Sequence, residues 1–417
     1  MNPRYKWYVV GMLWWIAFFN YADRQAIFSV FPLLEKEFHL SLAQLGLLGS
    51  SFAWAYGLCA PFAGNVVDRV RRKSAILGGL HAWSAICMAT ALARSFGGLL
   101  FFRASEGIGE SLYFPGSVSL ISDYHGKETR SRALGIHQTS VYIGTIAGGA
   151  FAGLIGQAYG WRWSFLVFGG LGVALGLFLK RFLREPERGS ADLERGRRAE
   201  RIPTREFLRI VWGTPTALLL MAAFLCANFV AVVLLSWMPK FLYDRFHLSL
   251  AAAGLTATVF VQLASMAGAP LGGWLADGLR KRTPGGRLLV QAVGVFGGAP
   301  FVVWCALTHS VKGLIMALIA WGFFKGLYDA NIFASLFDVI RPEARGTAAG
   351  FMNMTGWLGG GMAPLAVGYI AQSRGLGFAI ASAAAAYVAA GALLLAGAAT
   401  VRRDAARFAT PAHRRMN

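Results

Sequence analysis

Long apolar segments recur along almost the whole 417-residue chain and alternate with short polar loops. A helix needs about 20 apolar residues to cross the hydrocarbon core of a bilayer. The pattern therefore predicts an all-α membrane protein with twelve transmembrane helices. The predicted spans are residues 7–28, 44–66, 74–93, 97–121, 133–157, 162–182, 213–238, 250–276, 287–307, 312–337, 346–370 and 377–400.

The composition supports the same class of protein. Hydrophobic residues make up 56% of the chain and charged residues only 14%. A soluble protein of this length needs more polar residues to cover its surface, so the balance indicates lipid as the surrounding solvent. The 51 glycines fit as well, because membrane helices pack closely through small residues.

The net charge of +20 raises the question of a nucleic-acid partner. With both termini on one side of the membrane, most Lys and Arg residues outside the spans fall in the termini and loops of that side. This asymmetry is the positive-inside rule, and it predicts that both termini are cytoplasmic. The basic excess therefore reports membrane topology, and we expect membrane lipid rather than nucleic acid as the surrounding partner.

A polar segment divides the chain into two sets of six spans. The expected organisation is an N-terminal six-helix bundle (1–183), a cytoplasmic linker (184–212), a C-terminal six-helix bundle (213–402) and a cytoplasmic tail (403–417). Each chain then holds both bundles, so we expect a monomer.

One loop signature occurs in both halves. Gly64-Asn-Val-Val-Asp68-Arg69-Val-Arg-Arg72 follows the second span, and Gly273-Trp-Leu-Ala-Asp277-Gly-Leu-Arg280 follows the eighth. A glycine permits close helix approach, and the cations can bind the carboxylate or helix-terminal carbonyls. The repeat resembles the loop motif of the major facilitator superfamily. That resemblance implies two six-helix bundles, a central cavity and alternating access; a purely stabilising charge clamp is the alternative for these loops.

Ionisable residues inside spans are costly and need partners or a watery cavity. The three cations and four carboxylates nearly balance, which favours a mutually paired network. They are Asp23 and Arg24 in the first span, Arg103, Glu106 and Glu110 in the fourth, and Lys325 and Asp329 in the tenth.

Helical spacing indicates which of these groups can meet. Arg103, Glu106 and Glu110 are separated by three and four residues and therefore share one helix face. Lys325 and Asp329 are an i,i+4 pair. For that pair a structural salt bridge within the helix and a role in substrate binding remain equally open.

Two arginines in a membrane interior favour an anionic ligand, since a guanidinium stays charged and can bind a carboxylate through two hydrogen bonds at once. A carboxylate beside such an arginine becomes easier to protonate when substrate occupies the arginine. Proton and anion would then bind cooperatively, as symport requires. The alternative is that Arg103 and Glu110 form a purely structural bridge.

The first and fourth spans also resemble a particular branch, the anion:cation symporter family of galactonate and hexuronate carriers. The resemblance rests on Asn-Tyr-Ala-Asp23-Arg24, on Tyr56, and on Arg103-x6-Glu110 followed by Phe-Pro-Gly. It implies that Arg24, Tyr56 and Arg103 bind the anion and that Asp23 and Glu110 couple protons, in a bacterial inner membrane.

Other residues extend or unsettle this interpretation. Lys325, Tyr328 and Asn353 are further candidates for substrate binding, and Glu106 and Asp329 for proton coupling. Lys325 with Asp329 departs from the galactonate carriers. The fourth-span run Arg-Ala-Ser-Glu-Gly-Ile-Gly-Glu also resembles the spinster-type lysolipid and sphingolipid transporters, which are the alternative.

Enzymatic function is not expected. The sequence has no nucleophile elbow, no metal-ligand spacing and no phosphate-binding loop. We therefore expect a secondary transporter without metal or cofactor, which carries a sugar acid or similar carboxylate with protons as the coupling ion. Sodium as the coupling ion stays open, and so does the role of His137 in the fifth span.

Overall fold

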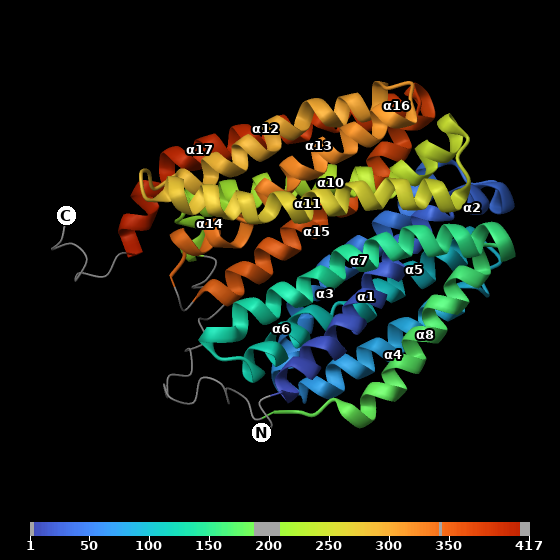
Figure 1. The fold of residues 1–417 in the computed structure, drawn as a ribbon, viewed down its shortest axis with the longest axis horizontal. Helices are drawn as coiled ribbons and strands as arrows, with labels where there is room; N and C mark the ends of the chain where they lie inside the picture. Colours follow the sequence, from blue (N-terminus) through green and yellow to red (C-terminus); the bar gives the residue numbers. More distant parts are fainter. Residues whose placement is uncertain (1–3, 187–208, 342–343, 409–417) are drawn as a thin grey trace. The chain divides into compact units, whose positions relative to one another are not determined.

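The computed structural model describes residues 4–186, 209–341 and 344–408, and every regular element within these ranges is a helix (Figure 1). The helices before the linker are α1 (Tyr5–Ser29), α2 (Phe31–Phe38), α3 (Leu42–Arg69), α4 (Arg72–Thr90), α5 (Phe96–Glu110), α6 (Tyr113–Tyr124), α7 (Lys127–Tyr159) and α8 (Trp161–Phe182). Those after it are α10 (Pro215–Phe246), α11 (Leu250–Arg280), α12 (Gly286–Leu307), α13 (Val311–Asp329), α14 (Ile332–Val339), α15 (Arg345–Arg374), α16 (Leu376–Ser382) and α17 (Ala384–Phe408).

Each predicted span coincides with one helix or with two consecutive helices. In the described part of the chain, eight segments are long and apolar enough to cross a membrane, so the protein is a multi-pass membrane protein. The number of twelve crossings and the cytoplasmic side of both termini stay predictions. The short helix α2, in the loop after the first span, was not predicted; a proline at its start favours helix initiation there.

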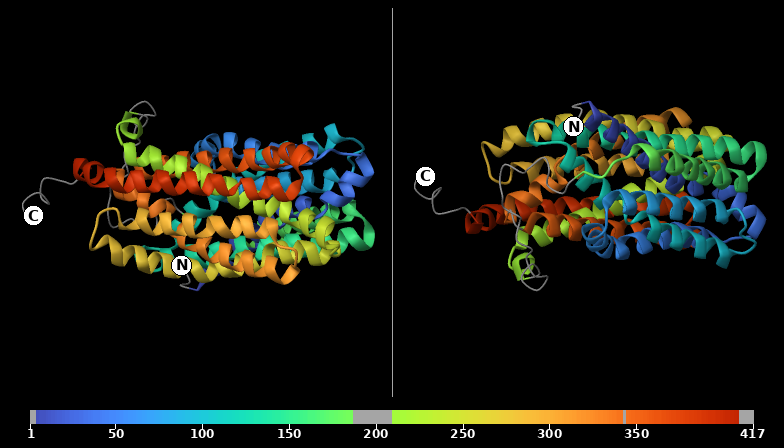
Figure 2. Two further views of the ribbon diagram at one scale, coloured as in Figure 1. Left: turned by 90° about the horizontal axis from the view of Figure 1, so that it is seen from above. Right: turned by 90° about the horizontal axis from the view of Figure 1, so that it is seen from below.

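The chain divides into two compact units. The first comprises residues 1–196, 233–262 and 361–376, and the second comprises residues 197–232, 263–360 and 377–417. In the first unit α1 packs against α7, α4 against α8, and α3 against α5. In the second unit α12 lies between its neighbours α13 and α17, and Figure 2 shows the long helices of each unit running alongside one another.

Two predicted spans are interrupted at corresponding places. The fourth consists of α5, which ends at Glu110, and α6, which begins at Tyr113; the tenth consists of α13, which ends at Asp329, and α14, which begins at Ile332. In each case the last residue before the interruption is an ionisable carboxylate. Broken helices are tolerated at membrane depth where they line a binding site or a cavity. The interruptions therefore make these two carboxylates candidates for functional residues.

A glycine brings α5 against α3. A Cβ atom on Gly107 would lie 2.5 Å from the carbonyl oxygen of Phe52 and 3.1 Å from the backbone nitrogen of Tyr56. No side chain fits there, and the close approach holds the charged face of α5 beside two aromatic residues of α3.

We therefore expect Gly107→Ala to destabilise the protein by about 1–3 kcal/mol, because the added methyl group collides with backbone that cannot move aside. Thermal unfolding of the purified protein in detergent measures the effect. Gly97→Ala is the matched control on the same helix, since a Cβ atom there meets nothing within 4 Å. Equal melting temperatures for the two variants would contradict the close approach of α5 and α3.

Candidate functional site

The first unit buries an ion pair between α1 and α5. Nε of Arg24 donates a hydrogen bond to Oε2 of Glu110. Arg24 is 8% exposed and Glu110 fully buried. With so little water nearby, each charge depends on the other for stabilisation.

Aromatic rings surround the guanidinium of Arg24. Its carbon atom lies 4.7 Å from the ring centre of Tyr21, 5.2 Å from that of Phe52 and 4.6 Å from that of Tyr56. The guanidinium of Arg103 lies 4.7 Å from the same Phe52 ring. Cation–π contacts of this kind strengthen when water is excluded. Both arginines therefore contact the same aromatic ring, that of Phe52.

Arg103 has its own carboxylate partner. Its Nη1 donates to Oε2 of Glu106 at 2.5 Å, one turn along α5, and both side chains are buried. Glu110, which the spacing places on the same face, pairs with Arg24 instead. The alternative of a bridge between Arg103 and Glu110 is thus not the arrangement that the structure shows.

A third carboxylate lies beside these pairs. Ligand atoms of Asp23, Cys87 and Glu106 all lie within 4.8 Å of one another, and all three side chains are buried. Oδ1 of Asp23 has no hydrogen-bond partner among the residues described. Such a trio offers ligand atoms for a cation, but the neighbouring guanidinium groups of Arg24 and Arg103 repel a metal ion, which makes a proton the better fit.

The charges of this site do not balance when every group is ionised. Two guanidinium groups face the three carboxylates of Asp23, Glu106 and Glu110, which leaves one negative charge in excess. An uncompensated charge is costly away from water, and a titratable group there tends to neutralise instead. One bound proton would make the cluster neutral.

The second unit holds the other predicted site residues. Lys325 and Asp329 form an ion pair within α13. Tyr328 is 3% exposed on the same helix, and Asn353 is half-buried on α15. The i,i+4 spacing alone accounts for the Lys325–Asp329 contact.

The repeated loop signature forms charge clamps in each unit. Arg72 is buried and binds the carboxylates of Asp123 and Glu185. Gly64 has open space around it, Arg69 is exposed, and the side chain of Asp68 lies outside the described part of the structure.

In the second unit Asp277 binds Arg287 at 2.8 Å, and Arg280 binds Asp338 at 2.8 Å. The aspartate of the signature thus binds an arginine farther along the chain, at the start of α12. The Asp277–Arg287 pair joins the end of α11 to the start of α12, and the Arg280–Asp338 pair joins the end of α11 to the end of α14.

Some residues of the site were not predicted. Phe52, Tyr21 and Cys87 lie on three different helices. Tyr21 precedes Arg24 by three residues, a spacing that places both on one helix face and could have identified it. His137 bonds through Nε2 to the hydroxyl of Tyr113 at 2.8 Å, which satisfies the ring nitrogen inside the bundle.

We expect Arg24→Gln to cost about 3–5 kcal/mol of stability at neutral pH, because it leaves Glu110 charged and buried without its partner. The double variant Arg24→Gln/Glu110→Gln should recover part of this loss, and lowering the pH should reduce the loss in the single variant by protonating Glu110. Thermal unfolding in detergent tests both points.

The exposed pair Arg162–Glu37, at 2.7 Å, is the matched control. Arg162→Gln and Arg162→Gln/Glu37→Gln should each lower the free energy of unfolding by about 1 kcal/mol or less, since water solvates each partner. If Arg24→Gln/Glu110→Gln were no more stable than Arg24→Gln, the loss in the single variant would not come from leaving Glu110 without its counter-ion.

Comparison with known proteins identifies the family. The model of the Major Facilitator Superfamily matches residues 13–364 and, in a second match, residues 246–413. The protein spinster of Drosophila melanogaster is 29% identical over 384 residues, which are 89% of this chain and 62% of that protein. The hexuronate transporter of Bacillus subtilis is 25% identical over 373 residues, 88% of each chain.

A solved structure shares the fold from end to end. The inward-facing, unoccupied crystal structure of a bacterial homologue of the human lysosomal transporter spinster superposes with a TM-score of 0.80. It is 25% identical and covers 98% of both chains. Since the family match spans most of the sequence and the fold is that of a solved transporter, this chain belongs to the Major Facilitator Superfamily and is a transporter, not an enzyme.

Proposed function

We propose that the protein carries a small organic anion, a sugar acid or similar carboxylate, together with protons by alternating access. The observation that carries the proposal is the buried cluster of Arg24, Arg103, Asp23, Glu106 and Glu110. We further propose that it works as a monomer in a bacterial inner membrane. The hexuronate transporter among the relatives supports an anionic substrate.

In this mechanism the anion competes with a carboxylate of the protein. A substrate carboxylate that binds Arg24 displaces Glu110, which loses the counter-charge that kept it ionised. A buried carboxylate without a cation takes up a proton, so anion and proton bind together. Tyr56, whose ring lies against Arg24, is in position to contact the same substrate.

The charge balance sets a minimum for the number of protons. The cluster carries one excess negative charge when fully ionised, and a bound monoanion adds a second. Neutrality then requires two protons on the three carboxylates, one of them taken up with the substrate. Asp23 and Glu106, which lie together beside Cys87, are the remaining acceptors.

Contacts at one end of the first unit support alternating access. Gln25 donates to the carbonyl of Leu235 at 2.8 Å, and Ser50 Oγ accepts from the backbone N–H of Leu365 at 3.1 Å. Lys240, which is 3% exposed, binds Glu35 at 2.5 Å. These contacts join the two sequence halves where α1 ends and α3 begins. With cytoplasmic termini this end is the outer one, and these contacts are ones that alternating access would have to break there.

We expect sugar acids to raise the melting temperature of the purified protein in a pH-dependent way, and Glu110→Gln to remove that dependence. The physical reason is that glutamine cannot take up the proton that accompanies substrate binding. In proteoliposomes the same variant should lose accumulation driven by a pH gradient while counterflow of labelled substrate persists.

Glu128→Gln, at an exposed glutamate on α7, is the matched control and should retain both properties. Accumulation by Glu110→Gln at the wild-type level would rule out Glu110 as a coupling group.

A second candidate function is transport of lysolipids or sphingolipids. The spinster relatives and the shared fold with a solved spinster homologue favour it. Arg24 and Arg103 would then bind a phosphate headgroup rather than a sugar carboxylate.

The two candidates predict opposite results in one experiment. The purified protein is heated with sugar acids or with lysophospholipids at matched concentrations. Protection by sugar acids that is lost in Arg24→Gln supports the anion symporter. Protection by lysophospholipids alone, also lost in that variant, supports the lipid carrier.

A further inference from the structure

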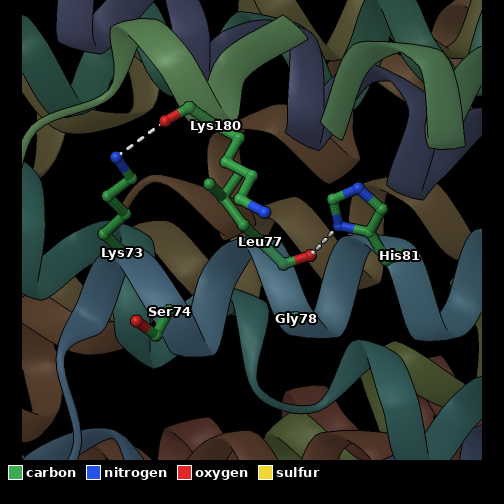
Figure 3. A pocket seen from close by; sticks show the side chains of 6 residues that line it. All are labelled: Lys73, Ser74, Leu77, Gly78, His81 and Lys180. Carbon is green, nitrogen blue, oxygen red and sulfur yellow. Dashed lines mark hydrogen bonds between the residues drawn. The ribbon is translucent and has the colours of Figure 1, made fainter. Parts of the chain in front are cut away.

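A small hollow lies between α4 and α8, away from the buried charge cluster (Figure 3). Its volume is about 260 Å³. The residues that line it are Lys73, Ser74, Leu77, Gly78, His81 and Lys180. Nothing in the proposed transport mechanism uses these residues.

Two lysine side chains face this hollow without a carboxylate partner among the residues described. Nζ of Lys73 donates to the backbone carbonyl of Lys180 at 2.8 Å. Figure 3 shows the side chain of Lys73, from α4, and that of Lys180, from α8, in the space between the two helices. By contrast, Lys240 and Lys325 are held by carboxylates. Within the described ranges, the two ammonium groups at the hollow therefore have no carboxylate counter-ion.

The nearby carboxylate is already engaged. Glu185 accepts hydrogen bonds from the backbone N–H of Arg72 at 3.1 Å and of Lys73 at 2.6 Å, which caps the start of α4. It also binds the guanidinium of Arg72. The positive character of the hollow thus comes from the two lysine ammonium groups rather than from the helix end.

The surroundings of the hollow are those of a membrane surface. Leu177 and Phe178 precede Lys180 on α8, and each is 61% exposed. Within the hollow, Nδ1 of His81 donates to the carbonyl of Leu77 at 2.6 Å. His81 lies eight residues beyond Lys73, or about 12 Å along the helix. The hollow therefore runs from a basic rim towards the apolar face of the bundle.

We propose that this hollow binds the headgroup of an anionic phospholipid. Lys73 and Lys180 bind the phosphate, the hydroxyl of Ser74 adds a hydrogen bond, and the acyl chains lie along Leu177 and Phe178. Basic hollows between membrane helices on the cytoplasmic side are suited to such headgroups, and the charge distribution predicts that this end is cytoplasmic. The volume is below the roughly 300–1,000 Å³ of sites that enclose a whole small molecule. It suits a headgroup whose chains remain outside.

The test compares lipid binding by two double variants of the full chain. Lys73→Gln/Lys180→Gln removes the two ammonium groups, and Arg71→Gln/Arg181→Gln removes two exposed charges at the same helix ends. Native mass spectrometry in mixed micelles measures binding of phosphatidylglycerol against phosphatidylcholine. We expect the lysine variant to lose about tenfold or more in affinity for phosphatidylglycerol. The arginine variant should retain its preference.

Lys180→Gln alone provides the same test if the double variant does not fold, since Lys180 is exposed. Equal losses in the lysine and arginine variants would show diffuse attraction to the basic surface and would overturn the proposal. Displacement of bound phosphatidylglycerol by inorganic phosphate at constant ionic strength would also overturn it, because the site would then hold a free anion. Transport of sugar acids is measured separately, and its outcome bears only on the proposed function.

Discussion

Every charge buried in the first unit has to be neutralised by the protein itself, because neither lipid nor a dry helix bundle supplies water to do so. Arg24 meets this requirement with Glu110, and Arg103 meets it with Glu106. Asp23 is left as the carboxylate in excess. In the proposed mechanism, an anion that enters this site is accompanied by a proton, because the displaced carboxylate must be neutralised.

The backbone makes this arrangement possible in two ways. Gly107 lets α5 approach α3 so closely that Phe52 and Tyr56 cover the arginines, and the break after Glu110 ends α5 at the carboxylate. The corresponding break after Asp329 in the tenth span shows that the same device occurs in the second unit. Interruption of a membrane helix is costly unless its backbone groups find partners, and both interruptions lie beside ionisable groups.

Charge pairs outside the site serve a different purpose. Arg72 binds Glu185, and Arg287 binds Asp277 and Asp338, and these pairs join the ends of helices. Glu185, Asp277 and Arg287 are each partly exposed, so water contributes to the solvation of these pairs.

The sequence by itself determined the features that depend on local order along the chain. Apolar runs located the helices, the repeated loop motif indicated the family, and the i,i+4 spacing of Lys325 and Asp329 accounted for their pair. The pairing within the cluster depended on tertiary structure. Arg103 could reach Glu106 or Glu110 from the same face of α5, and only the position of Arg24 on α1 decided that Glu110 pairs across helices. Helical periodicity describes one helix at a time, whereas the choice of a counter-ion depends on which helices pack together.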